Sequence, residues 1–157
     1  MLKKIISGGQ AGVDRGALDA ALQLGIECGG WCPRGRRAED GPIADHYPLT
    51  ETDATRYEQR TELNIIDSDA TLIITGGRLQ GGTRLTQELA LSHDKPCLII
   101  DLRQPVEPVQ ITQWLTALQI STLNVAGPRE SKQPGIADKT RELVVDLLKT
   151  QLTIQQS

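Results

Sequence analysis

The chain contains few aromatic residues and carries little net charge. The 157 residues include no phenylalanine, and the tryptophans and tyrosines are Trp31, Trp114, Tyr47 and Tyr57. Rings this scattered do not form a platform on which bases stack, and a net charge of -3 gives no reason to expect a nucleic-acid partner. We therefore expect a protein that binds no nucleic acid.

Cysteine is also scarce. Cys28, Cys32 and Cys97 make an odd count, which argues against the disulfide framework of a small secreted protein. His46 and His93 complete no zinc-binding spacing with these cysteines, so we expect no bound metal ion. Burial is the ordinary fate of such cysteines.

Long apolar runs are missing as well. No stretch approaches the ~20 apolar residues of a membrane span, and residues 1–4 lead into a predicted strand rather than a signal sequence. We therefore expect a cytoplasmic protein without a membrane partner. The length and the 38% hydrophobic content predict one domain over residues 1–152, followed by a polar tail over 153–157.

Short apolar runs alternate with helical stripes along the chain. Strands are predicted at 3–7, 26–31, 70–74, 96–100 and 122–126. Helices are predicted from apolar stripes within 17–24, 55–68, 85–91, 105–118 and 136–148, and Asp14 and Arg15 fall in the first turn of the first helix. This alternation predicts an α/β, Rossmann-like open parallel sheet of about five or more strands, with helices on both faces in three layers. Trp114 belongs to one helical stripe and is assigned either to the core or to a subunit interface.

A glycine-rich segment, Thr75 to Ala90, joins a predicted strand to a predicted helix. Its glycines allow positive φ and close approach of a ligand, and the first helical amides favour a bound anion. Thr83 is placed to cap that helix. A merely flexible turn is an equally good interpretation of this segment alone. The candidate ligand contacts are Gly76, Gly77, Gly81, Gly82, Thr83 and Thr86.

Two further glycine-bearing turns follow predicted strands. Carboxyl ends of parallel strands share one edge of a sheet, so all three turns are expected on one rim. The first turn matches no dinucleotide fingerprint, and no Walker lysine is present. Asp14 is also explained as a residue that complements the helix dipole. These turns add the candidates Gly8, Gly9, Gln10, Gly12, Asp14, Arg15, Arg129 and Ser131.

Arginines supply further candidates. Arg34, Arg36 and Arg37 follow the second predicted strand and suit a phosphate or another oxyanion, although charge runs are usually solvated. Arg60 and Asn64 are four residues apart and share one helix face, which is either exposed or directed into the same pocket.

Five stretches together resemble a known family. They cover residues 8–22 (GGQAGVDRGALDAAL), 29–43 (GGWCPRGRRAEDGPI), 59–73 (QRTELNIIDSDATLI), 81–90 (GGTRLTQELA) and 124–131 (NVAGPRES). The chain resembles the molybdenum cofactor carrier proteins, from a Rossmann-like superfamily that also contains lysine decarboxylase-like nucleotide hydrolases of the cytokinin-activating type. The resemblance implies a homo-oligomeric carrier of molybdenum cofactor, a molybdopterin with a phosphate, a dithiolene and a molybdenum-oxo centre. It also implies molybdoenzymes or cofactor-synthesis proteins as partners.

One position departs from the hydrolases of that superfamily. They carry Gly-Thr-x-x-Glu, whereas Thr86 stands here at the position of the glutamate, and Glu88 is rotated by ~200° around the helix. Arg60 is similar in position to the hydrolase arginine. We therefore expect a carrier without catalytic residues. The alternatives are a nucleoside monophosphate phosphoribohydrolase that uses Asp14, Glu39 or Asp40, and a nucleotide-sensing module.

Overall fold

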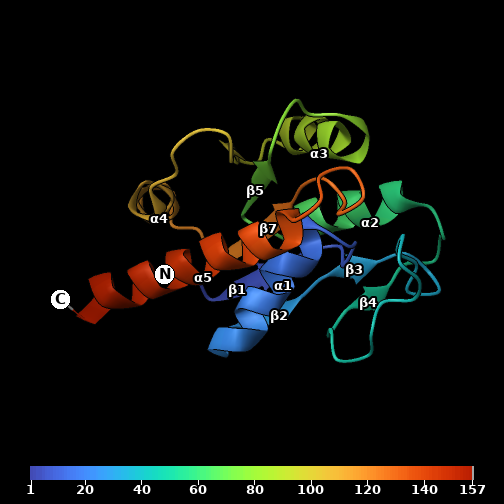
Figure 1. The fold of residues 1–157 in the computed structure, drawn as a ribbon, viewed down its shortest axis with the longest axis horizontal. Coiled ribbons are helices and arrows are strands. Elements are labelled where there is room, and N and C mark those ends of the chain that lie inside the picture. The colour runs from blue at the N-terminus through green and yellow to red at the C-terminus, as the bar shows by residue number, and fades with distance from the viewer. Residues whose placement is uncertain (157) are drawn as a thin grey trace.

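Five parallel strands form one sheet in the order β2-β1-β7-β5-β6 in the computed structural model, which describes residues 1–156 (Figure 1). The predicted Rossmann-like α/β fold is thereby confirmed. The three central strands are rich in β-branched and aliphatic residues and are largely buried, as expected for a parallel sheet covered on both faces. The strands of this sheet are β1 (Lys4–Ile6), β2 (Glu27–Gly29), β5 (Ala70–Thr75), β6 (Cys97–Asp101) and β7 (Thr122–Ala126).

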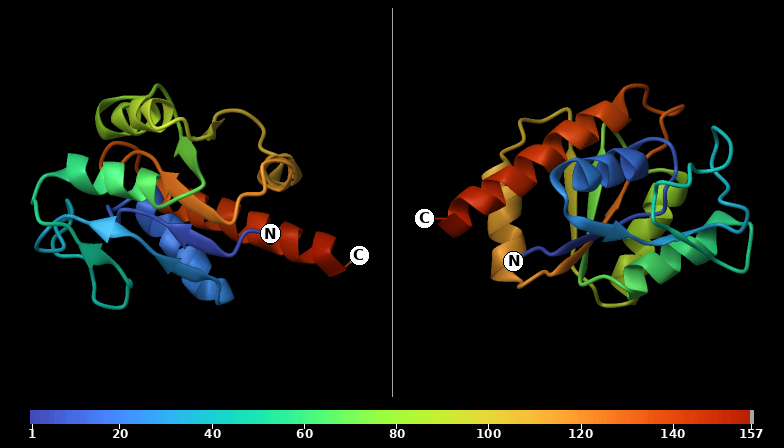
Figure 2. Two further views of the ribbon diagram at one scale, coloured as in Figure 1. Left: turned by 180° about the vertical axis from the view of Figure 1, so that it is seen from behind. Right: turned by 90° about the horizontal axis from the view of Figure 1, so that it is seen from below.

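Helices cover the two faces of the sheet in two groups (Figure 2). One face carries α1 (Val13–Leu24), α4 (Pro108–Ala117) and α5 (Ile136–Gln156), with α5 packed against both of the others. The other carries α2 (Tyr57–Ile66) and α3 (Gly81–Ser92). The crossovers through α1 and α4 run towards the β2 edge and those through α2 and α3 run away from it, so right-handed connections place the two groups on opposite faces.

The main core lies between the sheet and the layer of α1, α4 and α5. Leu72, Leu123 and Val125 of the sheet and Val144 and Leu147 of α5 are completely buried there. Trp114 of α4 is half-buried and packs against the same cluster, so its indole contributes to the core. This packing fixes the strands whose ends carry the candidate site.

One predicted strand is divided in two. Residues 26–31 form β2 and, after Gly30, the short β3 (Trp31–Cys32), which pairs with β4 (Thr50–Glu51) in a separate two-stranded sheet. Gly30 has φ of 129°, and a Cβ there would lie 2.3 Å from the carbonyl oxygen of Ser7. The chain therefore turns away from β1 at a residue that only glycine fits.

The final helix is longer than the sequence pattern predicted. α5 continues to Gln156, through most of the segment 153–157 expected as a polar tail, and Ser157 lies outside the described residues. Over residues 1–156, none of the helices combines the length and apolarity that crossing a lipid bilayer demands.

Candidate ligand-binding site

A cavity of about 730 Å³ opens at the carboxyl ends of β1, β5 and β7. These strands are neighbours in the sheet, so the three glycine-bearing turns that follow them converge on one rim, as predicted. The volume lies within the range of small-molecule sites. Of the predicted site residues, the cavity is lined by Gly8, Gln10, Asp14, Arg60, Asn64, Gly77, Gly81, Gly82, Thr83, Thr86 and Arg129.

The start of α3 faces this cavity with free backbone donors. Gln80 is the N-cap residue and makes no side-chain cap. Its carbonyl accepts hydrogen bonds from the amides of Thr83 and Arg84, at 3.1 and 3.3 Å. The amides of Gly81 and Gly82 have no partner within residues 1–156, and the first turn contains no acidic residue. Unpartnered amides of this kind, together with the helix dipole, favour a bound anion.

The other helices that start beside this cavity carry a carboxylate in or near their first turn, as α2 does with Glu58. The Glu130 carboxylate accepts hydrogen bonds from the amides of Gly135 and Ala137 at the start of α5. Asp14 lies in the first turn of α1. A bound anion at any of these helices would meet a carboxylate, so the start of α3 is the candidate place for an anion.

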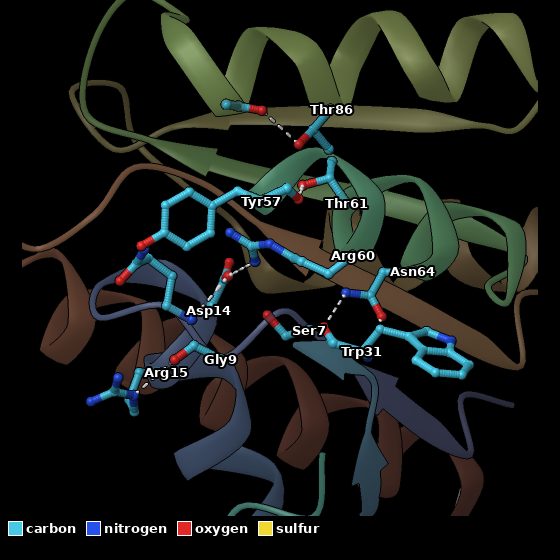
Figure 3. A network of polar contacts seen from close by, with 12 residues as sticks. Ser7, Gly9, Asp14, Arg15, Trp31, Tyr57, Arg60, Thr61, Asn64 and Thr86 are labelled. Carbon is cyan, nitrogen blue, oxygen red and sulfur yellow. Dashed lines mark hydrogen bonds and ion pairs between the residues drawn. The ribbon is translucent and has the colours of Figure 1, made fainter. Parts of the chain in front are cut away.

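A buried ion pair forms the wall of the cavity beside β1 (Figure 3). Arg60 Nη1 lies 2.9 Å from Asp14 Oδ2, and the two side chains are 13% and 6% exposed. The same oxygen accepts a hydrogen bond from the backbone N–H of Gln10 at 3.3 Å. Arg60 Nε and Gln10 Nε2 are buried without a partner.

Tyr57 organises the arginines at the mouth of the cavity. Its ring centroid lies 5.3 Å from the Arg60 guanidinium carbon, 5.4 Å from that of Arg129 and 4.7 Å from that of Arg37. Cation–π attraction holds guanidinium groups at such distances. Tyr57 was missed because its helical spacing is equally typical of a core residue.

The cavity is more basic than the chain as a whole. Arg60, Arg78, Arg129 and Lys132 line it, against Asp14 and Glu58. Several lining residues were absent from the predicted set, because an isolated polar residue in a loop or helix gives no local signal of its direction. They are Tyr57, Glu58, Thr61, Thr75, Arg78, Gln80, Leu85, Asn124, Ala126, Gly127, Pro128, Lys132 and Gln133.

Several predicted residues lie outside the lining of the cavity. Arg36 instead donates to the carbonyls of Ile43, Ala44 and Tyr47 at 2.7–2.9 Å and so holds its own loop together. Arg34 is exposed to solvent. The predicted residues that do not line the cavity are Gly9, Gly12, Arg15, Arg34, Arg36, Arg37, Gly76 and Ser131.

Contacts within the protein occupy others of this group. Arg15 forms a two-pronged pair with Asp40 at 2.8 and 3.0 Å, and this hydrogen bonding lowers the pKa of the Asp40 carboxyl. The Ser131 hydroxyl donates to Glu39 at 2.6 Å. The Gly76 amide donates to Gln133 at 2.7 Å. These contacts join the turns of the rim to one another and to the loop after β3.

Asn64 lines the cavity while its amide serves β3. Its Oδ1 accepts from the Trp31 amide at 2.7 Å, and its Nδ2 donates to the Trp31 carbonyl at 3.0 Å. The side chain therefore behaves as a strand partner for the residue after Gly30. Its polar atoms are already engaged before any ligand binds.

Carboxylates are sparse where hydrolysis would need them. Thr86 lines the cavity and donates to the Gly82 carbonyl at 2.9 Å, whereas Glu88 is exposed and pairs with Arg84 at 3.2 Å. Of the three acids considered above, Asp14 alone lines the cavity. The lining contains no cysteine or histidine, and the described residues contain no group of three or more His, Cys, Asp or Glu side chains able to hold a metal ion.

The fold is that of a Rossmann-like α/β protein with a candidate ligand cavity on its rim, and similarity to known proteins gives its family. A model of the circularly permutated YpsA SLOG family matches residues 5–148, so the chain belongs to that family. A crystal structure from Syntrophus aciditrophicus SB, of a protein named "putative molybdenum carrier protein", is 45% identical with a TM-score of 0.90, covering 94% of this chain and 95% of that one. The predicted family resemblance is thereby confirmed. No curated protein matches the chain.

Proposed function

We propose that the protein binds a molybdopterin-type cofactor in the cavity at the ends of β1, β5 and β7, and carries it without converting it. The observation that carries the proposal is the start of α3, where the Gly81 and Gly82 amides point unpartnered towards a cavity lined by cationic side chains. The phosphate of molybdopterin is the kind of group that such amides bind. The name of the similar Syntrophus protein supports a molybdenum-related cargo.

The cargo is bound through its organic part. Cys28, Cys32 and Cys97 do not line the cavity, and burial raises the pKa of all three thiols, which disfavours thiolate ligands. The lining therefore offers no thiolate that would bind the molybdenum directly. Arg78, Arg129 and Lys132 supply positive charge for the phosphate and the oxo-metal group.

Carriage rather than turnover follows from the acids present. Thr86 replaces the glutamate that the related hydrolases use, and Asp14 is paired with Arg60. The Asp14 oxygen that faces Arg60 is thus already engaged by a guanidinium rather than free to act on a leaving base. The proposal extends to shelter of the oxidation-prone pterin and its delivery to molybdoenzymes or cofactor-synthesis proteins.

A substitution at Gly82 tests the anion site with a matched control. A Cβ at Gly82 meets no atom within 4 Å, so a side chain is accommodated there. Gly82→Asp places a carboxylate where the phosphate binds, whereas Gly82→Asn adds the same volume without charge. We expect Gly82→Asp to lose at least ~10-fold more molybdopterin affinity than Gly82→Asn, because aspartate in a first turn favours the helix but repels an anion.

The measurement is retention of molybdopterin after rapid gel filtration, followed by its rate of oxidation in air. The wild-type protein is expected to retain the cofactor and slow its oxidation. Wild-type protein that retains none, or Asp and Asn variants that behave alike, would contradict the proposal.

Asp14 leaves one alternative, a nucleoside monophosphate phosphoribohydrolase, because it is a carboxylate in the cavity beside Arg60. Chromatography of a panel of nucleoside monophosphates separates the alternatives. Sustained base release that disappears in Arg60→Ala favours the hydrolase. Tight binding of an intact nucleotide in preference to molybdopterin favours a nucleotide-sensing module.

Self-association is part of the proposal and is supported by the edge of the sheet. The outer side of β6 pairs with no strand among residues 1–156, and its apolar Ile99 is 38% exposed. Such an edge suits a second copy of the chain. Sedimentation is expected to find an oligomer that Ile99→Lys dissociates and Ile99→Val preserves; a monomeric wild type would contradict this part.

A further inference from the structure

The Asp14 carboxylate is satisfied on only one of its oxygens. Oδ2 accepts from Arg60 Nη1 at 2.9 Å and from the Gln10 amide at 3.3 Å. Oδ1 accepts no hydrogen bond from residues 1–156, yet it is not sealed from solvent as Arg60 Nε and Gln10 Nε2 are. Since Asp14 lines the cavity, Oδ1 is an open acceptor on its wall.

A ligand that covers Oδ1 must bring a donor to it. A buried carboxylate oxygen stripped of water costs free energy unless an N–H or O–H group replaces the water. An anionic group is unsuited to this place because it would face a carboxylate of the same sign. Arg60 does not reverse this preference, because its charge is shared with Asp14.

The start of α3 has the opposite preference. The Gly81 and Gly82 amides are donors without partners, and Arg78 lies three residues before Gly81 in the same turn. The first turn of α3 contains no acid. One cavity thus has an anion-binding end and an end that accepts a donor, so its ligand must carry both kinds of group.

A phosphorylated pterin has this polarity. Its ring presents an exocyclic amino group and an adjacent ring N–H at one end, while the phosphate lies at the other. We infer that Asp14 Oδ1 accepts a hydrogen bond from the exocyclic amino group of the pterin while the phosphate occupies the start of α3. This inference rests on the proposed function and adds its specificity-determining residue.

Two probes that differ at one group test the contact. They are 6-hydroxymethylpterin monophosphate and the corresponding lumazine monophosphate, which keeps the ring N–H but has an oxo group in place of the exocyclic amino group. A site built around a donor rejects an analogue that lacks it, because the buried acceptor is left unpaired. Wild-type protein is expected to bind the pterin probe about 10- to 100-fold more tightly than the lumazine probe, measured by calorimetry.

Matched acid-to-amide variants assign the effect. Asp14→Asn is expected to reduce the ratio of the two affinities to within about 3-fold, because the amide offers both a donor and an acceptor. Asp40→Asn makes the same chemical change at a carboxylate that pairs with Arg15 outside the cavity lining, and it is expected to keep the wild-type ratio. Should Asp14→Asn fail to fold, the wild-type ratio decides.

The outcomes distinguish failure of the Asp14 contact from failure of the proposed function. Equal binding of both probes by wild type, with displacement by inorganic phosphate, overturns the role of Asp14 and leaves the phosphate site standing. An unchanged ratio in a folded Asp14→Asn protein also overturns it. Failure of wild type to bind either probe or molybdopterin overturns the proposed function itself.

Discussion

Arg60 lies so close to Gly8 that a Cβ at residue 8 would be 1.6 Å from its Nη1 atom. The same Nη1 is bound to Asp14 at 2.9 Å, so the guanidinium cannot swing aside without giving up its ion pair (Figure 3). Gly8 is therefore needed for the close approach of a side chain from α2 to the end of β1. The strand end and the helix meet only if residue 8 has no side chain.

Gly8→Ala is expected to displace Arg60 and destabilise the protein by about 2 kcal/mol, because overpacking and a disturbed ion pair add together. Urea denaturation measures the free energy of unfolding. The matched experiment repeats the substitution in an Arg60→Ala background, where the cost should fall because the obstructing group is gone. Equal costs in the two backgrounds would show that the contact is irrelevant.

Arg60→Ala alone is expected to destabilise the protein by about 3 kcal/mol, since it leaves the Asp14 charge nearly buried without its partner. Arg84→Ala is the control, because Arg84 pairs with Glu88 across four helical residues with both side chains more than half exposed. That loss should stay below about 0.5 kcal/mol. Comparable losses from the two variants would refute a buried pair at Asp14.

Tyr47 predicts an alkaline dependence of stability. Burial, followed by its 2.6 Å hydrogen bond to Asp19, raises the pKa of Tyr47 above the ordinary value of 10.0. A raised pKa in the folded state stabilises the fold fully below the ordinary pKa, and this contribution is lost as the pH rises through the folded value. The stability difference between wild type and Tyr47→Phe should therefore be largest at neutral pH and shrink above about pH 10. Denaturation curves at a series of pH values check this; a constant difference would contradict it.

Removal of the Glu130 carboxylate should free the amides at the start of α5 to bind an anion. Its carboxylate accepts the amides of Gly135 and Ala137, so Glu130→Ala is expected to cost about 1 kcal/mol, as loss of a helix cap does. Phosphate in the buffer should restore part of the melting temperature, because an added anion takes the place of the carboxylate. Chloride at equal ionic strength is the control. A melting temperature that responds equally to both salts would rule out anion binding there.

Much of the sheet was predictable from the order of apolar runs and glycines along the chain. The runs at Ala70–Thr75 and Thr122–Ala126 are apolar and β-branched over the length of one strand, and a glycine follows each within two residues. Because parallel strands align their carboxyl ends, the convergence of the turns followed from the order of the elements. The division at Gly30 was not predictable, because it depends on the backbone of Ser7, which follows β1 and is distant in sequence.

The candidate site was predictable only where the backbone forms it. The glycines Gly81 and Gly82 indicate the start of a helix from local sequence, without information on the tertiary surroundings. Side chains such as Tyr57 and Lys132 reach the cavity from separate elements, and nothing in their local sequence gives their direction. The arginine run misled for the same reason, since Arg36 turns towards the carbonyls of its own loop.

Arg36 holds the loop between β3 and β4 in one conformation. One guanidinium gathers the carbonyls of Ile43, Ala44 and Tyr47, so the segment between β3 and β4 keeps its shape with neither helix nor strand of its own. Because Arg36 maintains the conformation of the loop from within, exposed side chains such as Arg34 are not needed for its folding. Substitutions on that outer surface, at Arg34 for example, should therefore leave the conformation of the loop unchanged.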